Sequence, residues 1–193
     1  MMSHILSFDA YQGQTASEIG GKGLNLCLLR KAGFQVPHGY CVGVSAYDAM
    51  LAANLGLAAA IDDWFAMQAS QEQVEAAWQA AVWPQVLSEA LDQVSAELGA
   101  TTPLAVRSSA IVEDSAQFSF AGQFATKLGV AGGDALRHAL TACWASLCSE
   151  TLREHATVHG VKRCDLKMAV VVQTMIDPRA AGVTKFNYWK LWN

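Results

Sequence analysis

Residues 104–124 read LAVRSSAIVEDSAQFSFAGQF, an apolar run that contains an arginine, two serines and an acidic pair before a loop with a glycine. After Pro103, residues 104–108 are typical of a β-strand, and residues 124–130 alternate in the manner of a second strand. We expect the two strands to pair as a hairpin around a long polar loop. A strand that only fills a core would have no use for Arg107 at its end, so this stretch requires a chemical explanation as well as a structural one.

The rest of the chain alternates strand patterns with helix patterns. Gly20 and Gly21 end a loop before the first helix, Ser45 and Asp134 are the expected N-caps of two others, and Ser70 begins a capping box. Further strands are expected at residues 5–8, 40–44 and 166–176. Helices are expected at residues 22–32, at 46–60 with a weak point at Gly56, and from residue 71 until Pro84 interrupts the pattern. Two more helices are expected at residues 84–98 and from residue 134 to about 159. This mixture predicts an α+β fold.

The composition indicates a folded domain, because 52% of the 193 residues are hydrophobic and only 16% are charged. The net charge is −4 and neither sign forms a long block, so we expect no nucleic-acid partner. The five cysteines are odd in number and mostly have apolar surroundings, which favours buried thiols in a reducing compartment. No segment approaches the roughly 18 apolar residues of a membrane span, and no leader pattern opens the chain. We expect a cytoplasmic protein with no membrane partner.

A lysine follows two glycines at the start of the first predicted helix. The N-terminus of a helix presents N–H groups and the positive end of the helix dipole, so Lys22 would complete a site suited to phosphate oxygens. The segment is not a Walker A loop, because Ala16 and Gly23 occupy the first glycine position and the Ser/Thr position. The alternative is a solvated lysine at the start of a helix.

A second candidate is the arginine at the end of the predicted strand 104–108. Its planar, permanently charged guanidinium suits phosphate, and Gly122 in the following loop could bring backbone N–H groups close to the same oxygens. The alternative is a surface ion pair between Arg107 and Glu113 or Asp114.

A third candidate lies at the end of the last predicted strand, where a polar residue follows a run of valines. Gln173 and Met175 could place polar groups and an apolar side chain against a purine ring. The alternative is an ordinary glutamine of an edge strand and a core methionine.

Metal and nucleophile sites have less support. His155 and His159 are four residues apart on a predicted helix, but no glutamate accompanies them, so a helix-end pair without metal is favoured. We expect the tryptophans to lie in a core or an interface rather than in a base-stacking platform; these are Trp64, Trp78, Trp83 and Trp144.

Three stretches together resemble a known family. They are GGKGLNLCLLRKAGFQVPHGY (20–40), LAVRSSAIVEDSAQFSFAGQF (104–124) and MAVVVQTMIDPRAAGV (168–183). In this order and spacing they resemble the N-terminal nucleotide-binding domain of the phosphoenolpyruvate synthases (pyruvate, water dikinases), a group that includes pyruvate, phosphate dikinase and the rifampicin phosphotransferases. The resemblance covers residues 13–183.

The resemblance implies an ATP-grasp fold, with the first lobe and the start of the second lobe in residues 1–183 and a divergent tail in residues 184–193. It implies that ATP is bound, with Lys22 and Arg107 on its phosphates as the catalytic pair. Residues 119–126 would form the loop over the phosphates, and the residues expected to contact ATP there are Gly122, Gln123 and Thr126. Gln173 and Met175 would lie at the adenine.

The chain also departs from the family pattern. Ala125 stands where relatives often have an acidic residue, and the segment from Thr184 onward does not continue the pattern that follows Ala-Gly-Val in the family. The magnesium ligands, the phosphorylated histidine and the acceptor-binding domain are expected beyond the end of this chain. The resemblance therefore implies a truncated member.

The function implied is ATP binding for a dikinase that transfers the β-phosphoryl group of ATP through a phosphohistidine to pyruvate or another acceptor. We expect the chain alone to be inactive. The alternatives are a stand-alone nucleotide-binding or regulatory module, a rifampicin phosphotransferase-like fragment, and a degraded remnant that binds nothing. We also expect self-association, because an incomplete second lobe would leave apolar surface around residues 170–183 uncovered.

Overall fold

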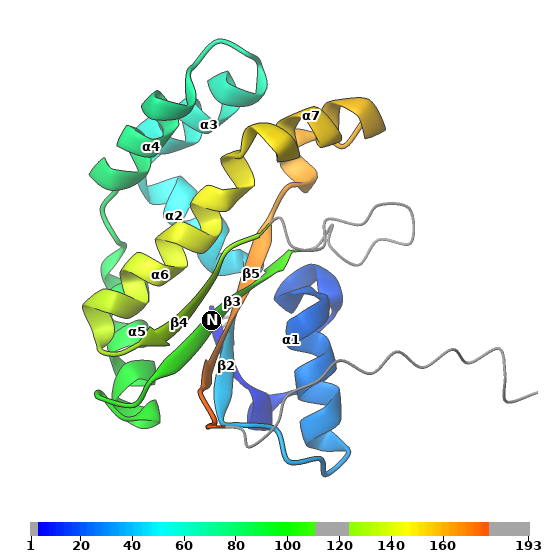
Figure 1. Ribbon diagram of the computed structural model, residues 1–193, viewed down its shortest axis with the longest axis vertical. Helices are drawn as coiled ribbons and strands as arrows, with labels where there is room; N and C mark the ends of the chain where they lie inside the picture. The colour runs from blue at the N-terminus through cyan, green and yellow to red at the C-terminus, as the bar shows by residue number, and fades with distance from the viewer. Residues whose placement is uncertain (1–3, 111–123, 178–193) are drawn as a thin grey trace, which may run out of the picture.

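The computed structural model describes residues 4–110 and 124–177. Its centre is a five-stranded antiparallel sheet with the strand order β1-β2-β5-β3-β4. Helix α1 lies on one side of the sheet, and helices α2 to α7 gather on the other side (Figure 1). The described part of the chain therefore has the α+β fold that the sequence predicts.

The strands are β1 (Ile5–Ser7), β2 (Gly39–Val42), β3 (Leu104–Ala110), β4 (Thr126–Val130) and β5 (Met168–Thr174). The α-helices are α1 (Ala16–Lys31), α2 (Val44–Ala53), α3 (Leu55–Phe65), α4 (Gln71–Ala80), α5 (Gln85–Leu98), α6 (Gly133–Ala145) and α7 (Glu150–His159). Three short 3-10 helices join them, namely η1 (Phe8–Ala10), η2 (Ser146–Cys148) and η3 (Arg163–Asp165).

Strand β5 occupies the middle of the sheet, between β2 and β3. Its valines 170, 171 and 172 are fully buried, because helices cover both faces of the sheet around them. This double cover explains why the strand is continuously apolar instead of alternating. The expectation of uncovered apolar surface is therefore wrong for residues 170–173, and exposure begins only at Met175 and Ile176. The rest of that expectation, residues 178–183, lies outside the described residues.

The predicted hairpin between β3 and β4 is confirmed. The two strands pair antiparallel, with Arg107 opposite Thr126 and Val106 opposite Lys127, and the register shifts between Leu104 and Val106. Strand β4 begins at Thr126 rather than at residue 124, and four of its five residues are exposed. Because β4 is an edge strand of the sheet, its alternating sequence does not produce alternating burial.

The main core lies between the sheet and helices α2 to α7, and tryptophans stand at its centre as predicted. Trp144 on α6 is fully buried, and its indole N–H donates to the carbonyl oxygen of Met168 at 3.2 Å. Its ring centroid is 5.4 Å from that of Trp83 and 6.4 Å from that of Trp78, both stacked, and 5.9 Å from that of Tyr47, edge-on. These aromatic rings thus connect α6, α4 and α2.

The expected helix 46–60 is two helices in the structure, and its N-cap is Gly43 rather than Ser45. The break falls at Asn54 instead of Gly56. The Asn54 side chain donates to the carbonyl oxygens of Met50 and Val82 and accepts from the Val82 N–H, so it fixes the turn between α2 and α3. Among the residues that the structure describes, no single helix could span a membrane by length and composition; α2 and α3 pass that test only as a pair bent by 106°.

The expected helix from Asp134 to about residue 159 is also interrupted. Gly132, not Asp134, is the N-cap of α6, and Asp134 lies in the first turn with its carboxylate 2.6 Å from Arg137. The side chain of Ser146 donates to the carbonyl oxygen of Cys143, and Ser149 caps α7 by accepting from the Leu152 N–H. These two serines compete with the helix backbone for hydrogen bonds, which explains the break.

Truncation of the central tryptophan tests this core. We expect Trp144→Ala to lower the free energy of unfolding by about 3–5 kcal/mol, because it removes a fully buried ring and its hydrogen bond. The exposed Val158→Ala is the control, with a change within about 0.5 kcal/mol. Urea unfolding followed by circular dichroism measures both, and equal effects of the two substitutions would contradict the assignment of the core.

An ion pair at the end of α1 predicts a pH dependence of stability. Arg30 donates to the Asp9 carboxylate at 2.7 Å and to the carbonyl oxygen of Val36 at 2.7 Å. The hydrogen bond from Arg30 holds the pKa of Asp9 below its usual 3.8. A carboxyl group with a lowered pKa stabilises the fold above its unfolded pKa, and this contribution is lost as the pH falls through the folded pKa.

We therefore expect the Tm of the wild type to fall more steeply below about pH 4 than the Tm of Asp9→Asn, in thermal unfolding at a series of pH values. Asp63→Asn, at an exposed carboxyl group, should keep the steepness of the wild type. Parallel curves for the wild type and Asp9→Asn would refute the contribution of Asp9.

Candidate functional site

Helix α1 begins at Ala16, six residues before the expected start at Lys22, and includes the glycines that were expected to form a loop. Thr15 and Glu18 form a capping box, in which the Thr15 N–H donates to the Glu18 carboxylate at 2.8 Å. This hydrogen bond lowers the pKa of Glu18. Within the helix, Gly20 has non-helical angles, with φ of 70° and ψ of 163°. The residue thus divides α1 into two segments.

The break at Gly20 lies directly against β3. A Cβ atom on Gly20 would lie 2.1 Å from both the carbonyl oxygen and the hydroxyl oxygen of Ser109. One turn later, a Cβ atom on Gly23 would lie 2.8 Å from the sulfur of Cys41. The two glycines therefore let α1 approach the sheet more closely than any residue with a side chain would allow.

Lys22 lies between these two glycines and reaches the sheet. Its Nζ atom donates to the carbonyl oxygen of Ser108 at 3.1 Å, and the side chain is half-buried. The alternative of a solvated lysine is wrong. Helix α1 therefore holds an ammonium group beside the residue that follows Arg107 in β3.

Arg107 lies in the middle of β3 and not at its end, because the strand continues through Ser108 to Ala110. It is the exposed member of a strand whose other residues are buried. Directly opposite residues of an antiparallel pair point to the same face. Arg107 is opposite Val171 and Thr126, and Val171 packs with Cys27 of α1, so Arg107 and Thr126 lie on the α1 face.

The alternative of an ion pair between Arg107 and Glu113 or Asp114 falls outside the described residues. Within residues 4–110 and 124–177, the Arg107 guanidinium forms no ion pair. The Gly122 and Gln123 positions also lie outside the described residues. Arg107 thus presents its positive charge on the face of the sheet that α1 contacts.

Gln173 lies on the same face, opposite Gly39 of β2 and Ala105 of β3. It is only 9% exposed, and its Oε1 atom is buried without a hydrogen-bond partner among the described residues. A buried acceptor that lacks a partner costs about 1–3 kcal/mol, so such a group commonly serves a ligand. Gln173 belongs to a central strand, so the alternative of an edge-strand glutamine is wrong.

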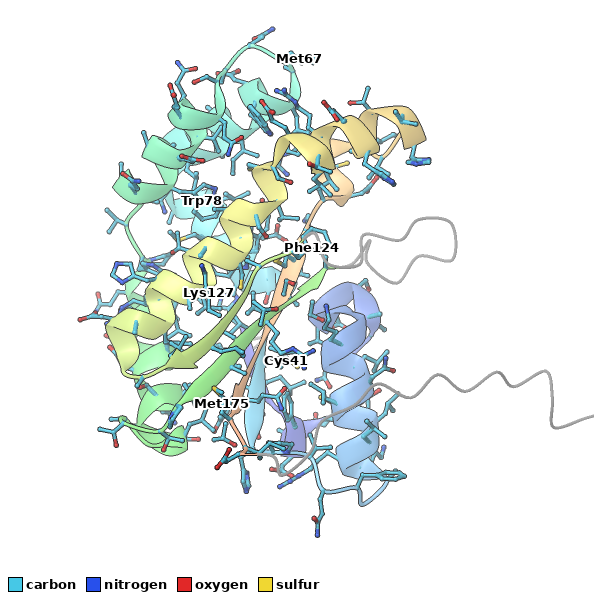
Figure 2. All side chains as sticks on the ribbon, viewed as in Figure 1. Cys41, Met67, Trp78, Phe124, Lys127 and Met175 are labelled. Carbon is cyan, nitrogen blue, oxygen red and sulfur yellow. The ribbon has the colours of Figure 1, made fainter. Side chains whose placement is uncertain are left out.

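Met175 follows β5 and lies beside β4. It is 39% exposed, its sulfur accepts from the Gly129 N–H at 3.1 Å, and its own N–H donates to Pro103 at 2.9 Å. The alternative of a core methionine is therefore wrong. In Figure 2, Met175 and Phe124 lie toward opposite ends of the sheet, and Cys41 lies between the sheet and α1.

The structure thus brings Lys22, Arg107, Thr126 and Gln173 onto one face of the sheet. The sequence assigns no role to Ser109 beyond its place after Arg107 and Ser108, although this side chain joins β3 to α1. Its hydroxyl accepts from the Gly23 N–H at 3.1 Å and donates to the carbonyl oxygen of Ile19 at 3.2 Å. No sequence signal marks this contact, because 90 residues separate Ile19 from Ser109.

The described residues also line two clefts away from Arg107. One of about 540 Å³ lies between β1 and the first turns of α1 and α2, and one of about 480 Å³ lies between α4 and α6. No group of three histidine, cysteine or acidic side chains converges to hold a metal ion within the part of the chain that the structure describes. The candidate site is therefore a face of the sheet with two cationic side chains and a buried amide acceptor.

Comparisons with known proteins identify the family of the chain. A family model described as the pyruvate phosphate dikinase AMP/ATP-binding domain matches residues 16–186. Rifampicin phosphotransferase of Streptomyces sviceus is 33% identical over 189 residues, which cover 93% of this chain and 22% of that protein. The prodigiosin synthesizing transferase of Serratia marcescens is 34% identical over 165 residues, or 86% of this chain and 18% of that protein. Phosphoenolpyruvate synthase of Pyrococcus furiosus is 29% identical over 210 residues, which cover 86% of this chain and 26% of that protein.

These comparisons identify a nucleotide-binding domain whose relatives include phosphotransferases. The chain belongs to the pyruvate phosphate dikinase AMP/ATP-binding domain family, as the sequence resemblance indicates. It spans 22%, 18% and 26% of the length of the three relatives named above.

The break in α1 predicts that Gly20 cannot be replaced. Its φ of 70° and ψ of 163° fall in a region used almost only by glycine, which costs other residues about 1–3 kcal/mol before the clash with Ser109 is added. We expect Gly20→Ala to lower the free energy of unfolding by more than about 2 kcal/mol in urea. Gly56→Ala is the matched control, because open space surrounds Gly56 in α3, and it should stabilise by about 0.5–1 kcal/mol. Equal effects would show that the break is not required.

Proposed function

We propose that the chain binds ATP on the α1 face, in the manner of the first lobe of an ATP-grasp protein. The observation that supports this most directly is the contact between Lys22 and β3, which holds an ammonium group beside the exposed Arg107. Two fixed cations on one open face form a local site for a polyphosphate in a protein whose net charge is −4.

The two cations would divide the work on the phosphates. Lys22 is a compact charge on a helix that is anchored to the sheet, whereas Arg107 can bind two phosphate oxygens with its planar fork. Phosphoryl transfer depends mostly on positioning and on neutralisation of charge. Thr126, directly opposite Arg107, would add a hydroxyl group at the same phosphates. Gly122 and Gln123 would contribute from the covering loop.

The adenine would lie at the other end of the site, against the end of β5. The unpartnered Oε1 of Gln173 can accept a hydrogen bond from an amino group, such as the exocyclic amino group of adenine. Met175 offers a polarizable side chain that packs well against an aromatic ring. The magnesium ion that accompanies ATP would take its ligands from outside the described residues.

The activity of a longer protein is a further part of the proposal. Relatives are named for phosphoenolpyruvate synthesis, for rifampicin and for prodigiosin, so this domain occurs with different acceptors. We propose that the chain supplies the ATP-binding part of a dikinase-like phosphotransferase acting through a phosphohistidine, with pyruvate or another acceptor. Residues 1–183 would form the ATP-binding unit, and turnover would require the domains that the longer relatives contain. The alternative is a binding or regulatory module without catalysis.

Calorimetric titration with ATP and magnesium tests the binding site. We expect the wild type to bind ATP and Lys22→Ala and Arg107→Ala each to weaken the affinity by about tenfold or more, because each removes a charge from the phosphates. Lys162→Ala is the matched control: this exposed lysine lies between α7 and η3, and its removal should change the affinity less than about twofold.

A wild type that binds no ATP would refute the proposal and favour a remnant without ligand. Binding that is the same in the wild type and in Lys22→Ala and Arg107→Ala would place ATP elsewhere. An assay for AMP in the same samples separates the catalytic proposals: formation of AMP by the purified chain would show that the chain needs no further domain for turnover.

A further inference from the structure

We infer that Ser109 is a positioning residue for Lys22, because it supplies from β3 the helix cap that α1 lacks at its internal break. This inference rests on the proposed function for the role of Lys22 at the phosphates. The capping itself rests on geometry alone.

The break leaves the second segment of α1 with a glycine in the N-cap position. Gly20 has extended, positive-φ angles, and the helical residues after it are Gly21, Lys22 and Gly23 as N1, N2 and N3. The side chain of an N-cap residue normally accepts from the N–H of N2 or N3. Gly20 has no side chain, but the Ser109 hydroxyl accepts from the Gly23 N–H, the N3 position, at 3.1 Å.

The same hydroxyl group also satisfies the segment before the break. It donates to the carbonyl oxygen of Ile19 at 3.2 Å, so one oxygen atom joins the two segments of α1. Ser109 is 1% exposed, and water cannot replace it without opening the contact. Gly20 leaves room for this arrangement, since a Cβ atom there would lie 2.1 Å from the same hydroxyl oxygen.

Lys22 is the residue between the two glycines, so the cap determines where its side chain points. A rotation of the second segment by one residue would turn Lys22 by about 100° around the helix axis and away from the sheet. With Ser109 in place, its Nζ atom meets the carbonyl oxygen of Ser108 at 3.1 Å. The Ser109 hydroxyl therefore fixes the backbone of this turn of α1. The carbonyl oxygen of Ser108 fixes the Lys22 side chain of the same turn.

Ser109→Ala tests the inference, and Ser108→Ala is its matched control. Ser108 is the same residue type in the same strand and is 2% exposed, but its side chain points away from α1 and the substitution keeps its carbonyl oxygen. Two ligands are titrated calorimetrically, ATP with magnesium and adenosine, which lacks phosphates. Hydrogen exchange of the Gly23 amide is measured in the same variants, and Lys22→Ala is combined with Ser109→Ala.

We expect Ser109→Ala to weaken ATP binding by about tenfold but adenosine binding by less than about twofold. Because an N-cap is lost, hydrogen exchange of the Gly23 amide should become about tenfold faster. When Lys22→Ala is already present, Ser109→Ala should weaken ATP binding little further, because the two residues act on one contact. Ser108→Ala should leave the ratio of the two affinities unchanged. A merely structural role of Ser109 would weaken both ligands alike.

The outcomes separate the inference from the proposed function. If the wild type binds ATP and Ser109→Ala binds it equally well, the positioning role is overturned while the proposed function stands. Equal losses for ATP and adenosine, or additive losses in the double variant, overturn it as well. If the wild type binds no ATP, the proposed function and the positioning role fail together. The cap is then tested only by the rate of hydrogen exchange at the Gly23 amide. Unchanged exchange in Ser109→Ala overturns the cap whatever the nucleotide does.

Discussion

The close approach of α1 to β3 is the constraint on which the rest of the site depends. Gly20 and Gly23 have no side chains to hold the helix away from the sheet. Ser109 and Cys41 fill the space that a Cβ atom on Gly20 or Gly23 would need. Only at this separation can the Lys22 ammonium group reach a backbone oxygen of β3. Cys27 and Cys41 are both buried in the same contact, and the neighbouring Cys27 thiol together with burial raises the pKa of Cys41. The helix and the sheet are therefore closely packed at this point.

The opposite side of the sheet has a different character, and this difference explains where ligands are expected. Helices α2 to α7 bury a continuous apolar core around Trp144, which stabilises the sheet. On the α1 face, only part of the sheet is covered, and Arg107 is exposed beside the covered part. A large core on one face thus supports a charged, partly open surface on the other.

The sequence predicts the elements well where local patterns decide them. The buried run that became β5, the capping box at Ser70 and the hairpin of β3 and β4 follow from periodicity and cap chemistry alone. The helix breaks at Asn54 and Ser146 were missed, because side chains that bond to distant or preceding backbone groups decide them.

For the site, the residue types of Lys22, Arg107 and Gln173 could be recognised, but not what holds them. Arg107 was expected at the end of its strand, and only the pairing with β5 shows that three more residues follow it in β3. Gly20 looked like part of a loop, since a glycine pair before a helix usually is one. Its true setting depends on Ser109, about 90 residues away, and no local pattern contains that information.

The position of β5 sets the order in which the molecule can assemble. The strand lies between β2 and β3, so the β1-β2 pair and the β3-β4 hairpin cannot join into one sheet until residues 168–174 have left the ribosome. Contacts between segments so far apart in the chain close slowly, because the entropy of a long loop is lost before any contact compensates for it. Helices α1 to α7 all leave the ribosome before this strand. The site itself, which needs α1 against a completed sheet, is therefore among the last features of the described chain to form during synthesis.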